Sequence, residues 1–218
     1  WDEQDGFYYD LLRLPDGRAT HLKVRSLVGL LPFCAVTVIE AEQRQRVPGV
    51  LARLKERVTH LPHLAEGVFV SEEGKLGVNG RGLAALVKED RLRRILRTML
   101  DEAEFLGPYG IRALSRYHDD HPYVFHVGRD AHKVAYCPAE SDSGVFGGNS
   151  NWRGPVWFPM NFLVIRALLH YHLYFGEAFE VECPTGSDRW MDLFHVAREI
   201  SDRLVRVFLR GPDGRHRA

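Results

Sequence analysis

The stretch that most restricts the fold is a long apolar run, "PVWFPMNFLVIRALLHYHLYF", at residues 155–175. Apolar side chains recur on all sides of a helix drawn through it with 3.6 residues per turn. Pro155 suits the first turn of such a helix, where a missing N–H breaks no hydrogen bond. A helix that is hydrophobic nearly all round has to be covered by other elements, so the run predicts a buried inner helix.

Amphipathic patterns predict further helices around it, about five in all. The clearest covers residues 88–105, where Leu92, Ile95 and Leu96 share one face and Arg93 and Arg97 the other. The remaining helices are predicted at 24–42 with a kink at Pro32, at 48–61 and at 192–209.

Two long stretches between these helices lack a helical pattern. Residues 62–87 are predicted to be a loop with a short extended piece, and residues 107–153 an irregular stretch with a hairpin at 123–136. A second hairpin is predicted around Pro15-Asp16-Gly17, because proline presets its backbone angle and glycine accepts a positive φ. Long loops in a compact domain usually carry function.

Composition excludes several classes of protein. The chain has 218 residues, 45% hydrophobic and 27% charged, with 29 basic and 29 acidic side chains. That balance argues against a nucleic-acid partner or an anionic membrane surface. Without a run of about 18 uninterrupted apolar residues, no membrane span is predicted.

The cysteines and the chain ends suggest where the protein works and what it is part of. Cys34, Cys137 and Cys183 are odd in number, far apart and outside any CxxC pair, so we expect no disulfide framework and a cytoplasmic location. The sequence begins at Trp1 and stops in "RGPDGRHRA", which favours a piece of a longer protein.

The first ten residues, "WDEQDGFYYD", combine carboxylates with aromatic rings. An aromatic ring can stack on the apolar face of a pyranose, while carboxylates accept hydrogen bonds from its hydroxyls. A solvated acidic turn leading into a strand would show the same composition. The candidate sugar-binding residues here are Trp1, Glu3, Asp5 and Phe7.

A second segment, "GNSNWRGPVW", places flat and hydrogen-bonding groups directly before the apolar helix. Amide side chains donate and accept, a guanidinium offers a planar fork of donors, and glycine lets a ligand approach the backbone. An asparagine-capped helix with buried tryptophans is the structural alternative. The candidates are Asn149, Asn151, Trp152, Arg153, Gly154 and Trp157.

Histidines gather in "HDDHPYVFH", but their spacing matches no standard metal signature. A solvated loop is the favoured interpretation of His118, His121 and His126. His170 and His172 lie two residues apart on a helix and point to different faces. We therefore predict no metal site and no cofactor.

Taken together, five stretches resemble consecutive motifs of glycoside hydrolase family 63, especially its bacterial mannosylglycerate-hydrolase-like and glucosidase-like members. They are "WDEQDGFYYDLLRLPDG", "LKVRSLVGLLP", "EFLGPYGIRALSRYH", "FGGNSNWRGPVWFPMNFLVIRAL" and "ECPTGS". The resemblance implies an all-α fold, part of an (α/α)6 toroid with long loops and small β-hairpins. Residues 1–218 would form a single, incomplete domain of that barrel.

The resemblance also implies a reaction, inverting hydrolysis of the α-glycosidic bond in α-glucosides or mannosylglycerate-like substrates. Such a reaction needs an acid and a base roughly 6.5–9.5 Å apart. The family's acid would lie upstream of this sequence and its base downstream, so the piece itself would be inactive and would contribute binding groups. Tyr109 and Arg112 in "GPYGIRALS" would line the same mouth, and Asp5 is the in-chain carboxylate chosen for any direct role.

Two other functions stay open at this point. A sugar epimerase or isomerase would require His118, His121 or His126 to converge inside a pocket. A non-enzymatic carbohydrate- or protein-binding helical module would leave Asp5, Trp152 and Arg153 in no common cavity. The partner expected in the leading interpretation is a carbohydrate.

Overall fold

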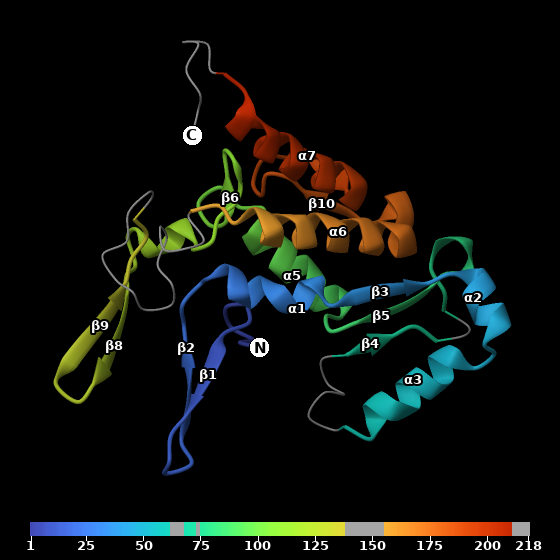
Figure 1. Cartoon of the computed structure of the whole chain (residues 1–218), viewed down its shortest axis with the longest axis horizontal. Helices are drawn as coiled ribbons and strands as arrows, with labels where there is room; N and C mark the ends of the chain where they lie inside the picture. The colour runs from blue at the N-terminus through green and yellow to red at the C-terminus, as the bar shows by residue number, and fades with distance from the viewer. Residues whose placement is uncertain (62–67, 73–74, 138–154, 211–218) are drawn as a thin grey trace.

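The computed structural model of the chain describes residues 1–61, 68–72, 75–137 and 155–210. Over these residues the protein is mixed α/β (Figure 1), with four two-stranded sheets and one three-stranded sheet beside its helices. The expected all-α, partial (α/α)6 toroid is therefore wrong, because much of the chain between the helices forms antiparallel strands.

Three long helices make the centre of the molecule, and shorter helical segments connect the strands around it. The α-helices are α1 (Leu31–Cys34), α2 (Ala41–Arg46), α3 (Val50–Thr59), α5 (Glu89–Met99), α6 (Phe158–Phe175) and α7 (Leu193–Val205). The 3₁₀ helices are η1 (Leu27–Leu30), η2 (Val78–Gly80), η3 (Arg116–His118), η5 (Gly176–Ala178) and η6 (Arg206–Phe208).

All of the strand pairs are antiparallel, and most are short hairpins. Their strands are β1 (Asp10–Arg13) with β2 (Ala19–Leu22), β6 (Leu106–Gly107) with β7 (Gly110–Ile111), β8 (Tyr123–Val127) with β9 (Asp130–Val134), and β10 (Glu180–Glu182) with β11 (Trp190–Asp192). The three-stranded sheet has the order β3 (Val36–Ile39), β5 (Gly82–Ala85), β4 (Phe69–Val70).

The core lies where α5, α6 and α7 meet. Leu92, Ile95, Leu96 and Met99 of α5 are all fully buried, which confirms the amphipathic pattern predicted for this helix. The buried cluster they belong to runs from Phe7 through the three helices to Leu204, so one apolar core joins both halves of the chain.

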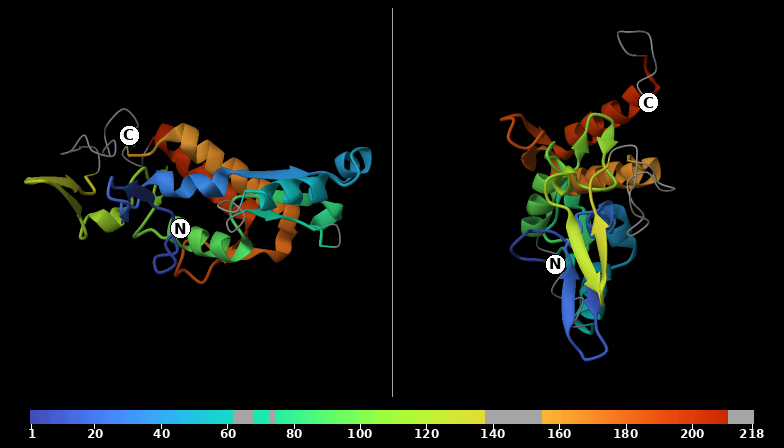
Figure 2. Two further views of the ribbon diagram at one scale, coloured as in Figure 1. Left: turned by 90° about the horizontal axis from the view of Figure 1, so that it is seen from below. Right: turned by 90° about the vertical axis from the view of Figure 1, so that its left-hand side faces the viewer.

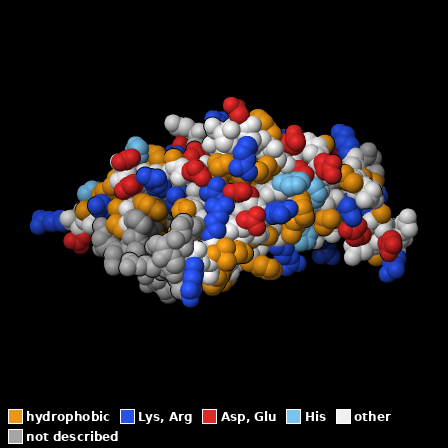
Figure 3. All heavy atoms as spheres, turned by 90° about the horizontal axis from the view of Figure 1, so that it is seen from above, with side chains coloured by type: hydrophobic (Ala, Val, Ile, Leu, Met, Phe, Trp, Pro, Cys, Tyr) orange, Lys and Arg blue, Asp and Glu red, His pale blue; other side chains and the backbone are white. Residues whose placement is uncertain are grey.

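The long apolar helix α6 buries only one side. Val164, Leu168 and Tyr171 are fully enclosed, but Phe162 is 62% exposed, and Leu169 and Leu173 on the same outer side are exposed as well. The prediction of a helix covered on all sides is thus wrong for the side that carries Phe162, Leu169 and Leu173. Figure 3 shows hydrophobic side chains lying between charged ones on the upper face of the molecule.

The region predicted as one helix at 24–42 is broken into η1, α1, β3 and the start of α2. The cause is the β-branched run Val36–Ile39, which pairs residue for residue with Gly82–Ala85 of β5. Pro32 accordingly stands in the first turn of the short α1 and does not kink a long helix.

Both predicted hairpins are confirmed. Gly17 takes a φ of 85° in the first turn, where the Leu14 N–H donates to the Arg18 carbonyl at 2.8 Å. The β1–β2 and β8–β9 hairpins project on the same side of the molecule, as two perpendicular views show (Figures 1 and 2).

Two further expectations concern disulfides and membranes. The three cysteines carry free thiols. Among the helices of the described ranges, each is too short or too polar to cross a bilayer.

Candidate functional site

The acidic and aromatic start of the chain folds into a strap, residues 1–9, that lies against α5. A bridge between Asp2 and Phe7 closes it, and the Asp2 carboxylate accepts hydrogen bonds from the N–H groups of Gln4 and Asp5. Phe7 is fully buried and stacks on Phe105, with ring centroids 5.6 Å apart. Its ring therefore packs in the core, out of a ligand's reach.

Phe7 can enter the core only because residue 29 is a glycine. A Cβ on Gly29 would come within 2.2 Å of the Phe7 ring and 2.4 Å of the Tyr8 carbonyl oxygen. The strap is therefore seated on η1 through a close backbone approach that no larger residue allows.

Trp1 and Glu3 attach the strap to the basic face of α5. The Trp1 ring lies under the guanidinium groups of Arg91 and Arg94, at 5.0 and 5.3 Å, and edge-on to Tyr8. Glu3 pairs with the same two arginines, each at 3.1 Å, and is 71% exposed. Two of the predicted binding residues, Trp1 and Glu3, thus hold the strap in place on α5.

Asp2 and Asp5 share one cation. Lys23 Nζ lies 2.9 Å from Asp2 Oδ2 and 3.1 Å from Asp5 Oδ2, and Asp5 also accepts from the Tyr9 hydroxyl at 2.9 Å. The Asp5 N–H and the Lys23 ammonium hold the pKa of the Asp2 carboxyl at about 2, below its usual value. Both carboxyl groups are thereby fixed in position, and Asp2 is held in its charged form.

From Tyr9 the hydrogen bonds continue into the interior. Arg25 Nε donates to the Tyr9 hydroxyl at 3.3 Å, Arg25 pairs with Glu104, and Ser115 donates to the other oxygen of Glu104. The Arg25 guanidinium also covers the Tyr117 ring at 4.0 Å. We call this chain the polar network. Its members are Asp2, Asp5, Tyr9, Lys23, Arg25, Glu104 and Ser115.

Burial sets the protonation of two network members. It raises the pKa of Tyr9 to about 12, so the phenol remains a donor to Asp5. Burial also raises the pKa of Glu104, although the Ser115 hydroxyl and the Arg25 guanidinium act against that shift. The network therefore connects Asp2, whose pKa is lowered, with Glu104, whose pKa is raised.

Beside the network, between the strap and α1, lies an open cavity of 420 Å³ that we call the strap cavity. Tyr8, Tyr9 and Asp10 line it together with Val28, Leu31 and other residues of η1 and α1. The Asp10 side chain forms no hydrogen bond or ion pair with any residue of the described ranges. The cavity thus offers a free carboxylate next to two aromatic rings.

Arg112 lies deeper, under the β6–β7 turn. It is 8% exposed, and its Nη1 donates to the backbone carbonyls of Glu102 and Glu104 at 3.0 and 3.1 Å. These bonds shape the loop that carries Glu104. Tyr109 is half-buried in the turn itself, and Trp157 is half-buried against the core at the start of α6.

Five predicted binding residues, Asn149, Asn151, Trp152, Arg153 and Gly154, lie outside the described residues. The chain that follows them is anchored close to the strap cavity. The Ala113 N–H donates to the Pro155 carbonyl at 2.8 Å, and the Leu27 N–H donates to the Ala113 carbonyl at 2.9 Å. Residue 155 is therefore one backbone segment away from η1, which forms a wall of that cavity.

With this geometry established, comparison with known proteins identifies the family. Residues 82–206 match the mannosylglycerate hydrolase MGH1-like glycoside hydrolase domain. The chain belongs to this family. It is also 44% identical over 214 residues to the uncharacterized protein YMR196W of Saccharomyces cerevisiae, an alignment that covers 98% of this chain and 20% of the relative. The chain thus spans about a fifth of that relative's length.

The matched part of this MGH1-like glycoside hydrolase domain starts at β5 and ends in η6. It contains the three core helices together with Glu104, Arg112 and Ser115, whereas the strap and Lys23 precede it. The polar network therefore connects the residues that match the family with the residues that precede them in the chain.

The histidines of this MGH1-like domain do not converge on a pocket. His118 is buried, its Nε2 accepts from the Arg25 N–H at 2.8 Å, and its Nδ1 faces the His121 carbonyl at 2.9 Å. His121 and His126 are exposed. This arrangement argues against the epimerase alternative. In the described part of the chain, no three His, Cys, Asp or Glu side chains gather closely enough to bind a metal ion.

Proposed function

We propose that this chain is part of a glycoside hydrolase acting on α-glucosides or mannosylglycerate-like substrates, and that the strap cavity is a sugar-binding subsite. The observation that carries the proposal is the free Asp10 carboxylate beside Tyr8 and Tyr9, in an open 420 Å³ cavity of a glycoside hydrolase domain. Its volume lies in the range of small-molecule sites, about 300–1,000 Å³.

The chemistry of the walls suits a pyranose. A tyrosine ring offers an apolar face to the ring C–H groups, and the Asp10 carboxylate accepts hydrogen bonds from hydroxyls. Tyr9 is held by Asp5 and Arg25, so its ring stays in one orientation without a ligand. Such preorganisation reduces the entropy lost on binding.

The polar network would support this subsite without touching the sugar. In an inverting mechanism the acid and base stand roughly 6.5–9.5 Å apart, and we expect both to come from outside these 218 residues. Asp5 accordingly acts as a positioning residue that fixes Tyr9. The chain's own contribution is binding and orientation of the sugar.

Sugar binding is tested by titrating methyl α-glucoside and mannosylglycerate into the chain and following ligand signals by saturation-transfer NMR. Asp10→Asn removes a charge-assisted hydrogen bond, so affinity should fall about tenfold. Asp16→Asn in the β1–β2 turn is the matched control, because among the described residues Asp16 pairs with Arg18 alone and lies outside the cavity wall.

Equal binding by wild type and Asp10→Asn would rule out the strap cavity as the subsite. The hydrolytic part is tested separately, by assaying the full-length protein for release of glucose or mannose with inversion at the anomeric carbon. Retention of configuration would contradict the proposed mechanism while leaving the binding result intact.

A further inference from the structure

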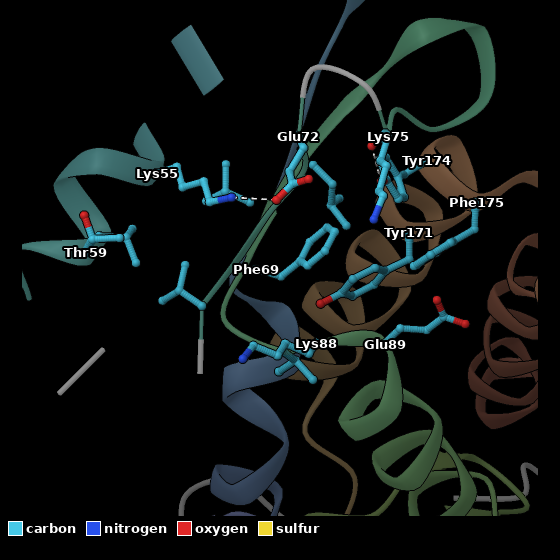
Figure 4. A pocket seen from close by; sticks show the side chains of 15 residues that line it. Lys55, Thr59, Phe69, Glu72, Lys75, Lys88, Glu89, Tyr171, Tyr174 and Phe175 are labelled. Atoms are coloured by element: carbon cyan, nitrogen blue, oxygen red, sulfur yellow. Dashed lines mark hydrogen bonds and ion pairs between the residues drawn. The ribbon is translucent and has the colours of Figure 1, made fainter. Parts of the chain in front are cut away.

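A second and larger cavity lies between α3, the β3–β5–β4 sheet and α6. Its volume is 540 Å³, and we call it the lateral cavity (Figure 4). Its walls are mainly apolar, formed by Val58, Phe69, Leu83, Val87, Tyr174 and Phe175. Neither the resemblance nor the family match assigns it a role.

The clearest sign that this cavity takes a ligand is the hydroxyl group of Tyr171. The residue is fully buried, and its hydroxyl oxygen makes no hydrogen bond with any residue that the structure describes. The ring is stacked between Phe33, at 5.5 Å, and Phe175, at 6.3 Å, so it has little freedom to turn towards another partner. In Figure 4 the phenol oxygen points into the cavity.

An unsatisfied buried hydroxyl is costly, and proteins rarely retain one without a reason. Burial also raises the pKa of Tyr171, which keeps the group protonated and able to donate. A hydrogen-bond acceptor inside the cavity would complete its bonding.

The charged side chains at the cavity are unbalanced towards positive charge. The two acidic residues there already have partners, since Glu72 pairs with Lys55 at 2.6 Å and Glu89 with Arg93 at 3.0 Å. Lys75 and Lys88 make no ion pair through their side chains in the described chain. Figure 4 shows the Lys75 ammonium directed inwards and Lys88 along the lower edge.

The groups at the cavity that lack a partner among the described residues can all donate, namely the Tyr171 hydroxyl and the Lys75 and Lys88 ammonium groups, and they face an apolar wall. A neutral sugar would need acceptors for its hydroxyls, whereas each carboxylate here already has one oxygen in an ion pair with Lys55 or Arg93. A carboxylate would instead accept from the Tyr171 hydroxyl and the Lys75 ammonium, while an apolar body would fill the space beside Phe69 and Phe175.

We propose that the lateral cavity binds a small organic anion, a carboxylate with an apolar body, through Tyr171, Lys75 and Lys88. This site is independent of the strap cavity, and its function does not depend on the sugar subsite.

The proposal is tested with 4-phenylbutyrate, titrated into the whole chain by isothermal calorimetry, with the neutral amide 4-phenylbutanamide as charge control. The acid should bind at least tenfold more tightly than the amide. Lys75→Met and Tyr171→Phe should each weaken binding of the acid about tenfold, whereas Lys133→Met on β9, away from the cavity, should leave it unchanged.

Thermal unfolding of each variant checks that the fold is kept. The proposal is overturned by absent binding of the acid, by equal binding of acid and amide, or by unchanged affinity in both Lys75→Met and Tyr171→Phe. Tighter binding of methyl α-glucoside than of the acid, lost in Tyr171→Phe, would reassign the cavity to carbohydrate.

Discussion

The polar network and the lateral cavity are built from the same kinds of side chain but differ in how far their hydrogen bonds are satisfied. In the network, the Tyr9 hydroxyl donates to Asp5 and accepts from Arg25, and Lys23 is shared by two carboxylates. In the lateral cavity the Tyr171 hydroxyl has no partner, and Lys75 and Lys88 lack ion pairs among the described residues. Side chains whose hydrogen bonds are satisfied within the protein stabilise the fold, whereas side chains without such partners are available to bind a ligand.

The largest expected effect comes from breaking the inner end of the network. Arg25 and Glu104 form an ion pair whose side chains are 18% and 13% exposed, so Glu104→Ala leaves a largely buried guanidinium without its counter-charge. We expect a loss of about 3–5 kcal/mol in the free energy of unfolding, measured by urea denaturation.

The matched control is the exposed pair at the lateral cavity. Lys55 and Glu72 are 52% and 54% exposed, so Glu72→Ala should cost less than about 1 kcal/mol. Similar losses for Glu72→Ala and Glu104→Ala would mean that burial does not distinguish the two regions.

Removing the hydroxyl of Tyr9 or of Tyr171 should change the stability by a smaller amount, with opposite signs for the two residues. Tyr9→Phe breaks a satisfied hydrogen bond and should destabilise the fold by about 1 kcal/mol. Tyr171→Phe removes a buried hydroxyl that no described residue bonds, and should be neutral or stabilise by up to about 1 kcal/mol. Melting temperatures of the two variants give the comparison directly, and a destabilised Tyr171→Phe would show that the hydroxyl is already bonded.

The smallest expected effect is a pH dependence at the edge of the network. The Arg25 N–H donates to His118 Nε2, so that nitrogen has to remain unprotonated for the bond to persist. Burial lowers the pKa of His118 below its usual value of about 6.5. As the pH falls through about 6.5, the unfolded chain binds a proton that the folded chain resists, so stability should fall.

Urea midpoints at pH 7.5 and 5.5 measure this dependence. His118→Gln should reduce the difference between the two midpoints, whereas His121→Gln, at an exposed position, should retain it. An unchanged difference in His118→Gln would assign the pH dependence to other groups.

The parts of the fold that were predictable from sequence are those whose signals are local. The 3.6-residue period of α5 and the Pro-Asp-Gly turn of the first hairpin each lie within one short segment. Residues 24–42 were mispredicted because Val36–Ile39 form a strand by pairing with β5, and β5 lies more than forty residues further along the chain. Similarly, the exposed side of α6 depends on which elements reach it, and its own sequence carries no such information.

The candidate site divides in the same way. The combination of acidic and aromatic residues at the start of the chain indicated a special role, and Asp5 does lie in the polar network. Its partners Lys23, Arg25 and Glu104 carry no motif and are brought together only by tertiary structure. The sequence carries no signal that distinguishes Tyr171, because a tyrosine in an apolar helix resembles any other core residue.

The seating of Phe7 against Gly29 and Phe105 has a consequence for how the protein is made. A ribosome releases these three residues in order, and the core they share extends to Leu204 in α7. Phe7 and its neighbours in the strap therefore leave the exit tunnel long before Phe105 and α7, which complete their surroundings. Until α7 has emerged they are exposed on a nascent chain, where chaperones can bind them.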